Sequence, residues 1–99
     1  MRIIWRFRAK RERADEFRSV YGSGGAWARL FARSPEYQGT ELLQDVSDPV
    51  QFVVIDSWKS RDGFERFRRE FASEYEALDQ ECLELTEDEI FIGDFRAES

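Results

Sequence analysis

Asp56 is the residue in this sequence whose surroundings most suggest chemistry. It follows the apolar run at positions 52–55. Alternate residues of a strand point to the same face of a sheet, so the Asp56 carboxylate should lie on the same largely apolar face as Val54 and Trp58. A carboxylate placed there needs a partner or a raised pKa. Asp56 could then be a general base that removes a proton from an acidic phenol or carbon. The alternative is a structural ion pair with Arg6 or Arg8 on the neighbouring strand.

Aromatic residues make up 15% of the chain and recur where side chains should point inward. They could line a pocket between helices and sheet, with Asp56 as its ionisable group. The candidate lining residues are Tyr21, Trp27, Phe31, Trp58, Phe67 and Phe71. The alternative is ordinary core packing, because aromatic residues at helical or strand spacing are usually core residues.

Several other kinds of site find no support in the sequence. The chain has no histidine, and its single cysteine, Cys82, lies on an apolar helical stripe with no base to activate it. The glycines at positions 22–25 do not have the spacing of a phosphate-binding loop, and they predict a helix end followed by a flexible link. No cluster has metal-ligand spacing, so we expect neither a metal nor a cofactor.

Hydrophobic periodicity predicts the elements that position these residues. Strands are expected at residues 2–8, 37–46, 51–58 and 89–95, and helices at 14–21, 26–33 and 61–83, with a single helical turn at 86–89. The order β-α-β-β-α-β predicts one ferredoxin-like α+β domain over residues 1–99. We expect the first and third strands to form a parallel central pair, with both helical layers on one face of the sheet.

The predicted strands carry apolar residues on both faces. Val53 and Ile55, for example, alternate with Phe52 and Val54. Helices can cover only one of these faces, so the other face requires a cover that this chain does not supply. The simplest cover is a second copy of the chain, which predicts a homodimer.

Charge and composition limit the choice of partners and compartment. Residues 1–33 carry a net charge of +6 and residues 34–99 a net charge of −12. This asymmetry favours complementary charge within the fold or between subunits, and we expect no nucleic-acid partner because an acidic chain repels phosphate. Binding of nucleic acid through the Arg-rich first strand remains a third alternative. No apolar run suits a membrane span or a signal peptide, and a lone cysteine allows no internal disulfide. We therefore expect a cytoplasmic protein.

Several segments together resemble the antibiotic biosynthesis monooxygenase family of dimeric α+β barrels. The most specific is Trp58-Lys59-Ser60 at the end of the third strand, followed by aromatic residues on the next helix. The others are residues 25–28, 39–43, 55–58, 64–67 and 93–95. The resemblance covers nearly the whole chain and implies a ferredoxin-like protomer whose sheet packs against a second copy.

The resemblance implies a cofactor-independent monooxygenase acting on a small, polyketide-like aromatic compound, or a protein that binds one. Family members that degrade haem use an asparagine, a tryptophan and a histidine, whereas this chain has no asparagine or histidine. Phe67 and Ala77 occupy the positions expected for that tryptophan and histidine, so haem degradation is disfavoured. The alternative is a non-catalytic dimeric domain with a regulatory, stress-related or scaffolding role.

Overall fold

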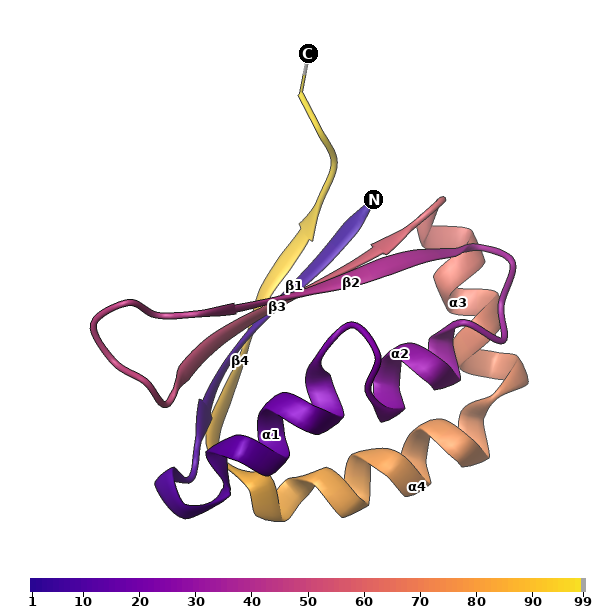
Figure 1. The fold of residues 1–99 in the computed structure, drawn as a ribbon. Helices are drawn as coiled ribbons and strands as arrows, with labels where there is room; N and C mark the ends of the chain where they lie inside the picture. Colours follow the sequence, from indigo (N-terminus) through magenta and orange to yellow (C-terminus); the bar gives the residue numbers. More distant parts are fainter. Residues whose placement is uncertain (99) are drawn as a thin grey trace.

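The computed structural model describes residues 1–98 of the 99-residue chain as a four-stranded antiparallel sheet with its helices on one face (Figure 1). None of the helices within these residues has the length and hydropathy needed to cross a membrane. The elements follow one another as β1 (Arg2–Ala9), the 3-10 turn η1 (Arg11–Arg13), α1 (Ala14–Tyr21), α2 (Ala26–Phe31), β2 (Tyr37–Gln44), β3 (Gln51–Trp58), α3 (Arg61–Glu70), α4 (Ala72–Cys82), the 3-10 turn η2 (Leu83–Leu85) and β4 (Thr86–Phe95).

The sheet has the strand order β2-β3-β1-β4, and every neighbouring pair is antiparallel. The ferredoxin-like α+β prediction is confirmed, but the prediction of a parallel central pair is wrong. The crossover through α1 and α2 makes β2 run in the same direction as β1. The hairpin at Asp45–Val50 then reverses the chain, so β3 runs opposite to both β2 and β1.

The predicted helix at residues 61–83 is two helices. It begins as expected at Ser60, whose hydroxyl accepts a hydrogen bond of 3.0 Å from the Gly63 amide. It is interrupted at Phe71, where φ is −111° and ψ is 31°. The Phe71 ring packs on Phe67 and beneath the guanidinium of Arg33. No glycine or proline marks the interruption, and Figure 1 shows that α3 and α4 run in clearly different directions.

Several element boundaries also differ from the prediction. The turn expected at residues 86–89 is absent: η2 ends at Leu85, which is 2% exposed, and β4 begins at Thr86, paired with Ala9. β2 ends at Gln44 rather than at position 46, because the Asp45 side chain accepts hydrogen bonds from the amides of the following loop. α2 ends at Phe31, two residues earlier than predicted.

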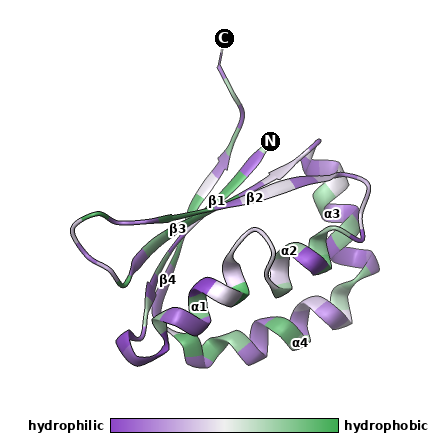
Figure 2. Ribbon diagram, in the orientation of Figure 1, coloured by the Kyte–Doolittle hydropathy of each residue, from purple (hydrophilic) through white to green (hydrophobic). Residues whose placement is uncertain are grey.

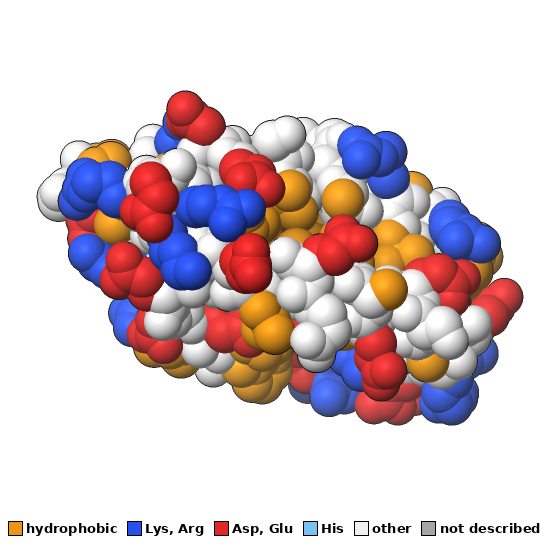
Figure 3. Space-filling view, turned by 90° about the horizontal axis from the view of Figure 1, so that it is seen from below, with side chains coloured by type: hydrophobic (Ala, Val, Ile, Leu, Met, Phe, Trp, Pro, Cys, Tyr) orange, Lys and Arg blue, Asp and Glu red, His pale blue; other side chains and the backbone are white. Residues whose placement is uncertain are grey.

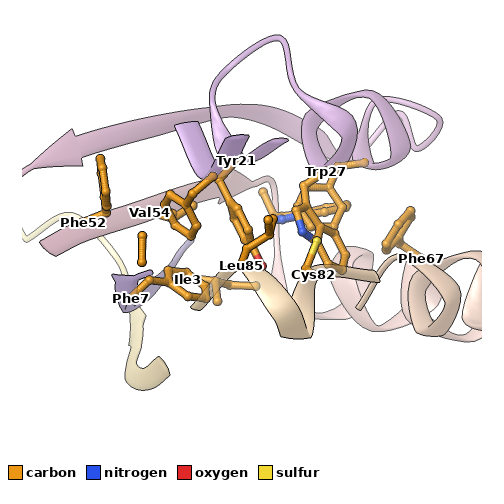
Figure 4. Close-up of a cluster of buried hydrophobic side chains, with 13 residues drawn as sticks. Ile3, Phe7, Tyr21, Trp27, Phe52, Val54, Phe67, Cys82 and Leu85 are labelled. Carbon is orange, nitrogen blue, oxygen red and sulfur yellow. The ribbon is translucent and has the colours of Figure 1, made fainter. Parts of the chain in front are cut away.

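The core lies between the sheet and the helices and is largely aromatic (Figure 4). Its largest fully buried side chains are Trp58, Phe17, Phe52 and Phe67. Figure 2 shows hydrophobic residues along the strands, whereas α1 and α4 mix hydrophobic and hydrophilic residues. Helix formation is thus favoured by amphipathic faces that pack onto a continuous apolar sheet surface.

The outer face of the sheet also carries apolar residues. The pairing of neighbouring strands places Leu43, Val53 and Ile90 beside Arg6 on this face. Leu43 is 43% exposed and Ile90 is 37% exposed. No helix within residues 1–98 covers them. Apolar residues therefore lie on both faces of the sheet, as the strand pattern predicted.

Ion pairs join the basic first third of the chain to the acidic remainder. Arg8 lies 3.0 Å from Asp48 and 3.6 Å from Glu87. Arg13 pairs with Glu84 and Arg33 with Glu74. The charge asymmetry of the sequence is therefore partly matched inside the fold.

Candidate functional site

A cavity of about 580 Å³ lies between the helix-facing side of the sheet and the helices. Its walls come from β1, β3, β4 and all four helices: Trp5, Phe7, Tyr21, Trp27, Phe31, Val54, Asp56, Arg68, Tyr75, Glu76, Asp79, Gln80 and Glu89. The exposed members Glu76, Gln80 and Glu89 form a mouth between α4 and β4. Seen from the helical side, charged side chains surround a few hydrophobic ones (Figure 3).

Asp56 lies in the sheet wall of this cavity. It has the same strand parity as Val54 and Trp58, both buried on the helix-facing side, and it pairs with Thr40 of β2. The Thr40 hydroxyl donates a hydrogen bond of 2.6 Å to Oδ1 of Asp56. The Tyr37 hydroxyl lies 2.5 Å from the same Thr40 oxygen. Because a threonine has one hydroxyl proton, Tyr37 donates to Thr40 and Thr40 donates to Asp56.

Burial raises the pKa of Asp56 to about 6, and the hydrogen bond from Thr40 partly opposes this rise. No ion pair within residues 1–98 includes Asp56. The alternative of a structural pair with Arg6 or Arg8 is therefore not found. Both arginines alternate with the inward-facing Phe7, and Arg8 pairs with Asp48 and Glu87 instead. Asp56 is thus a partly buried carboxylate that accepts a hydrogen bond from Thr40 and has no ion-pair partner within residues 1–98.

Three of the predicted aromatic residues line the cavity together. Tyr21 ends α1, and Trp27 and Phe31 lie one turn apart on α2. The Trp27 ring centroid is 6.2 Å from that of Tyr21 and 5.6 Å from that of Phe31. Tyr75 of α4 meets Trp27 edge-on at 4.9 Å. Ring faces and edges of four aromatic residues thus form one continuous wall.

Gly25 makes this arrangement of α1 and α2 possible. A Cβ atom at this position would lie 2.3 Å from the carbonyl oxygen of Val20 and 2.4 Å from that of Ser19. Only a residue without a side chain lets the chain turn back so close to the end of α1. The segment that was predicted to be a helix end followed by a flexible link therefore places Tyr21 next to Trp27.

The other three predicted pocket residues lie outside the cavity lining. Trp58 and Phe67 are 0% and 1% exposed, and each packs against Phe31 with ring centroids 5.4 Å apart. Phe71 packs on Phe67 at 5.2 Å. These residues support the aromatic wall from behind, so their position fits the core-packing alternative.

The structure adds lining residues that sequence reasoning missed. Trp5 and Phe7 alternate along the first strand, and Tyr75 belongs to the helical stripe, so their periodicity marked them as inward-facing without distinguishing core from cavity. Arg68, Glu76, Asp79 and Glu89 had no such pattern. Where they point depends on the interruption at Phe71 and on the start of β4, neither of which the sequence revealed.

Charge gathers at the mouth of the cavity. The Arg68 guanidinium lies 3.8 Å from the centre of the Tyr75 ring, a cation–π contact. Burial, followed by the negative charges of Asp79 and Asp88, raises the pKa of Glu89. Deeper in the fold, Cys82 lies beside Trp27 (Figure 4), and burial raises the pKa of its thiol, so it is an unreactive core residue.

Comparisons with known proteins identify one matching family model and several solved structures with a similar fold. The family model described as antibiotic biosynthesis monooxygenase matches residues 1–74. No curated protein matched the sequence significantly. PA3566 from Pseudomonas aeruginosa superposes with a TM-score of 0.69 and 16% identity, over 98% of this chain and 93% of that one. SnoaB, a cofactor-independent oxygenase from Streptomyces nogalater, gives 0.66 and 23%, over 97% and 93%. At these sequence identities, the superpositions show a shared fold and nothing more.

Proposed function

Because the chain belongs to the antibiotic biosynthesis monooxygenase family, we propose that it binds a small aromatic compound in the cavity and oxygenates it without a cofactor. The observation that carries this proposal is Asp56, a carboxylate without an ion-pair partner in the wall of an aromatic cavity of about 580 Å³. A cavity of this size suits a small multi-ring ligand. This volume favours a ligand-binding protein over a purely structural domain.

Asp56 is proposed as the general base. With a pKa of about 6 it is ionised at neutral pH and is a stronger base than an ordinary aspartate. It would remove a proton from a ring CH₂ group made acidic by a neighbouring carbonyl. The carbanion gives one electron to O₂, and the resulting radical and superoxide join through a new C–O bond. The peroxide recovers the proton from Asp56 and loses water. The CH₂ group and O₂ have then become a C=O group and water.

The aromatic wall and the core behind it would serve this reaction in two ways. Tyr21, Trp27 and Phe31 offer ring contacts that orient a flat substrate. Trp58 and Phe67 keep that wall rigid from behind and exclude water from its base. In this proposal they are positioning residues that do not touch the substrate.

The test is oxygen consumption with a panel of anthrones and related phenols, combined with quenching of tryptophan fluorescence. Asp56→Asn should lower the rate by about 10²–10⁴-fold, the usual contribution of a general base. Substrate binding should persist, because the aromatic wall is unchanged. Asp62→Asn, which alters an exposed carboxylate in the first turn of α3, should leave the rate unchanged. Absence of quenching by every compound would reject the proposal and favour a non-catalytic domain.

We further propose that the protein is a homodimer that buries the outer face of the sheet. This face carries Leu43, Val53 and Ile90, with Arg6 among them. Large exposed apolar surfaces of this kind usually form interfaces. The expected interface is of the obligate type and buries on the order of 2,000 Å² or more in total.

A further inference from the structure

The carboxylates that line the cavity have no ion-pair partner within residues 1–98. Nine aspartate and glutamate side chains lie within 4 Å of an arginine nitrogen elsewhere in residues 1–98. None of these pairs includes a cavity residue. The four unpaired carboxylates of the lining are Asp56, Glu76, Asp79 and Glu89.

From this imbalance we propose that the cavity binds an aromatic compound carrying a positive charge, such as a multi-ring amine protonated at neutral pH. The inference rests on the proposed function, because it names the class of aromatic ligand that the same cavity would take. Four carboxylates and one guanidinium line the cavity, so its electrostatic potential favours a cation over an anion.

Two acids of the cavity lining come from different elements of the fold. Asp79 projects from α4 and Glu89 from β4, close enough for the charge of Asp79 to act on Glu89. Two like charges held in this way raise the free energy of the empty site. A ligand cation between them would replace this repulsion by attraction.

The aromatic wall provides the second half of a site for organic cations. Trp5, Trp27 and Tyr75 all line the cavity, and ring faces attract cations, tryptophan most strongly. One cation–π contact already exists at this wall, between Arg68 and Tyr75. Arg68 occupies only that ring and makes no ion pair with the four carboxylates.

A positive charge on the ligand would also solve an electrostatic difficulty of the proposed reaction. Removal of a proton by Asp56 neutralises that carboxylate and moves its negative charge onto the ring, in a cavity that is also lined by Glu76, Asp79 and Glu89. An ammonium group on the same molecule, held near Asp79 and Glu89, would keep the deprotonated ligand neutral overall. An aromatic carboxylate would add a further negative charge and should bind poorly.

Three anthracene derivatives with the same ring system test the inference: 9-anthracenemethylamine, 9-anthracenemethanol and 9-anthracenecarboxylate. Dissociation constants come from the change in ligand fluorescence and in tryptophan quenching at low salt. We expect the amine to bind about 10-fold more tightly than the alcohol, from cation–π and charge attraction. The carboxylate should bind more weakly than the alcohol. The preference for the amine should decrease as salt rises.

The double variant Asp79→Asn with Glu89→Gln should bring the ratio of the amine and alcohol dissociation constants close to one. Asp62→Asn, outside the cavity, should alter neither. Equal affinity for all three compounds, or tightest binding of the carboxylate, would overturn the inference while leaving an aromatic site in place. Failure of all three to bind would overturn the proposed function itself. The ligand series on the unmodified protein decides between these outcomes even if the double variant does not fold.

Discussion

At the scale of single residues, Asp56 links stability to pH. Its pKa is about 6 in the folded protein, above the ordinary value of 3.8. The folded state therefore favours the protonated Asp56 carboxyl group over the ionised one. The stabilisation of the folded state by this proton is fully present below about pH 4 and is lost as pH rises through about 6. A difference of roughly two pKa units between the folded and unfolded states corresponds to about 3 kcal/mol of unfolding free energy.

Asp56→Asn should abolish this dependence. Relative to the unmodified protein, the variant should gain about 2–3 kcal/mol of unfolding free energy between pH 4 and pH 7.5, because an amide never acquires the buried charge. Urea unfolding at several pH values measures this difference. The Asp62→Asn control, at an exposed carboxylate outside the cavity, should not show this gain. A variant whose stability relative to the unmodified protein falls as pH rises would contradict the assignment of a raised pKa.

At the scale of elements, the turn between α1 and α2 depends on one glycine. Gly25→Ala should destabilise the protein by about 2–3 kcal/mol, because its Cβ would overlap the carbonyl oxygens of Ser19 and Val20. Gly24→Ala is the matched control, since nothing lies within 4 Å of a Cβ atom at that position. It should be neutral or slightly stabilising. Chemical denaturation of both variants provides the measurement, and equal effects would show that the turn can relax.

The same turn links element geometry to binding. Gly25→Ala should also weaken aromatic ligand binding more than Gly24→Ala, because it moves Trp27 relative to Tyr21. The interruption at Phe71 has a comparable role on the opposite side of the cavity. It sets α4 at an angle to α3 and so brings Tyr75 and Asp79 to the cavity.

At the scale of the whole molecule, the outer face of the sheet should determine assembly. Leu43→Glu places a charge opposite Val53 on this face and should convert the proposed dimer to a monomer. Val46→Glu is the matched control, because Val46 is fully exposed in the β2–β3 hairpin loop. Sedimentation velocity at micromolar concentration distinguishes the two species. An unmodified protein that sediments as a monomer would refute the proposed dimer.

Local sequence patterns alone determined most of the architecture. Alternation placed Phe7, Phe52 and Val54 on the helix-facing side, and Ser60 marked the start of α3 correctly. The parity of Asp56 with its apolar neighbours put a carboxylate on that face. These features depend on period and on neighbouring residues, and such information is contained in a short stretch of chain.

Only the tertiary structure decided which aromatic residues line a cavity and which fill the core. Trp27 and Trp58 were both predicted to face inward, yet Trp27 lines the cavity while Trp58 lies behind Phe31. The partner of Asp56 is Thr40 rather than an arginine, because strand pairing brings Thr40 to the same face. Asp79 and Glu89 line one cavity although α4 and β4 are separate elements, so their proximity depends on how these elements are placed. Distances between elements far apart in the chain are set by packing, which no local pattern encodes.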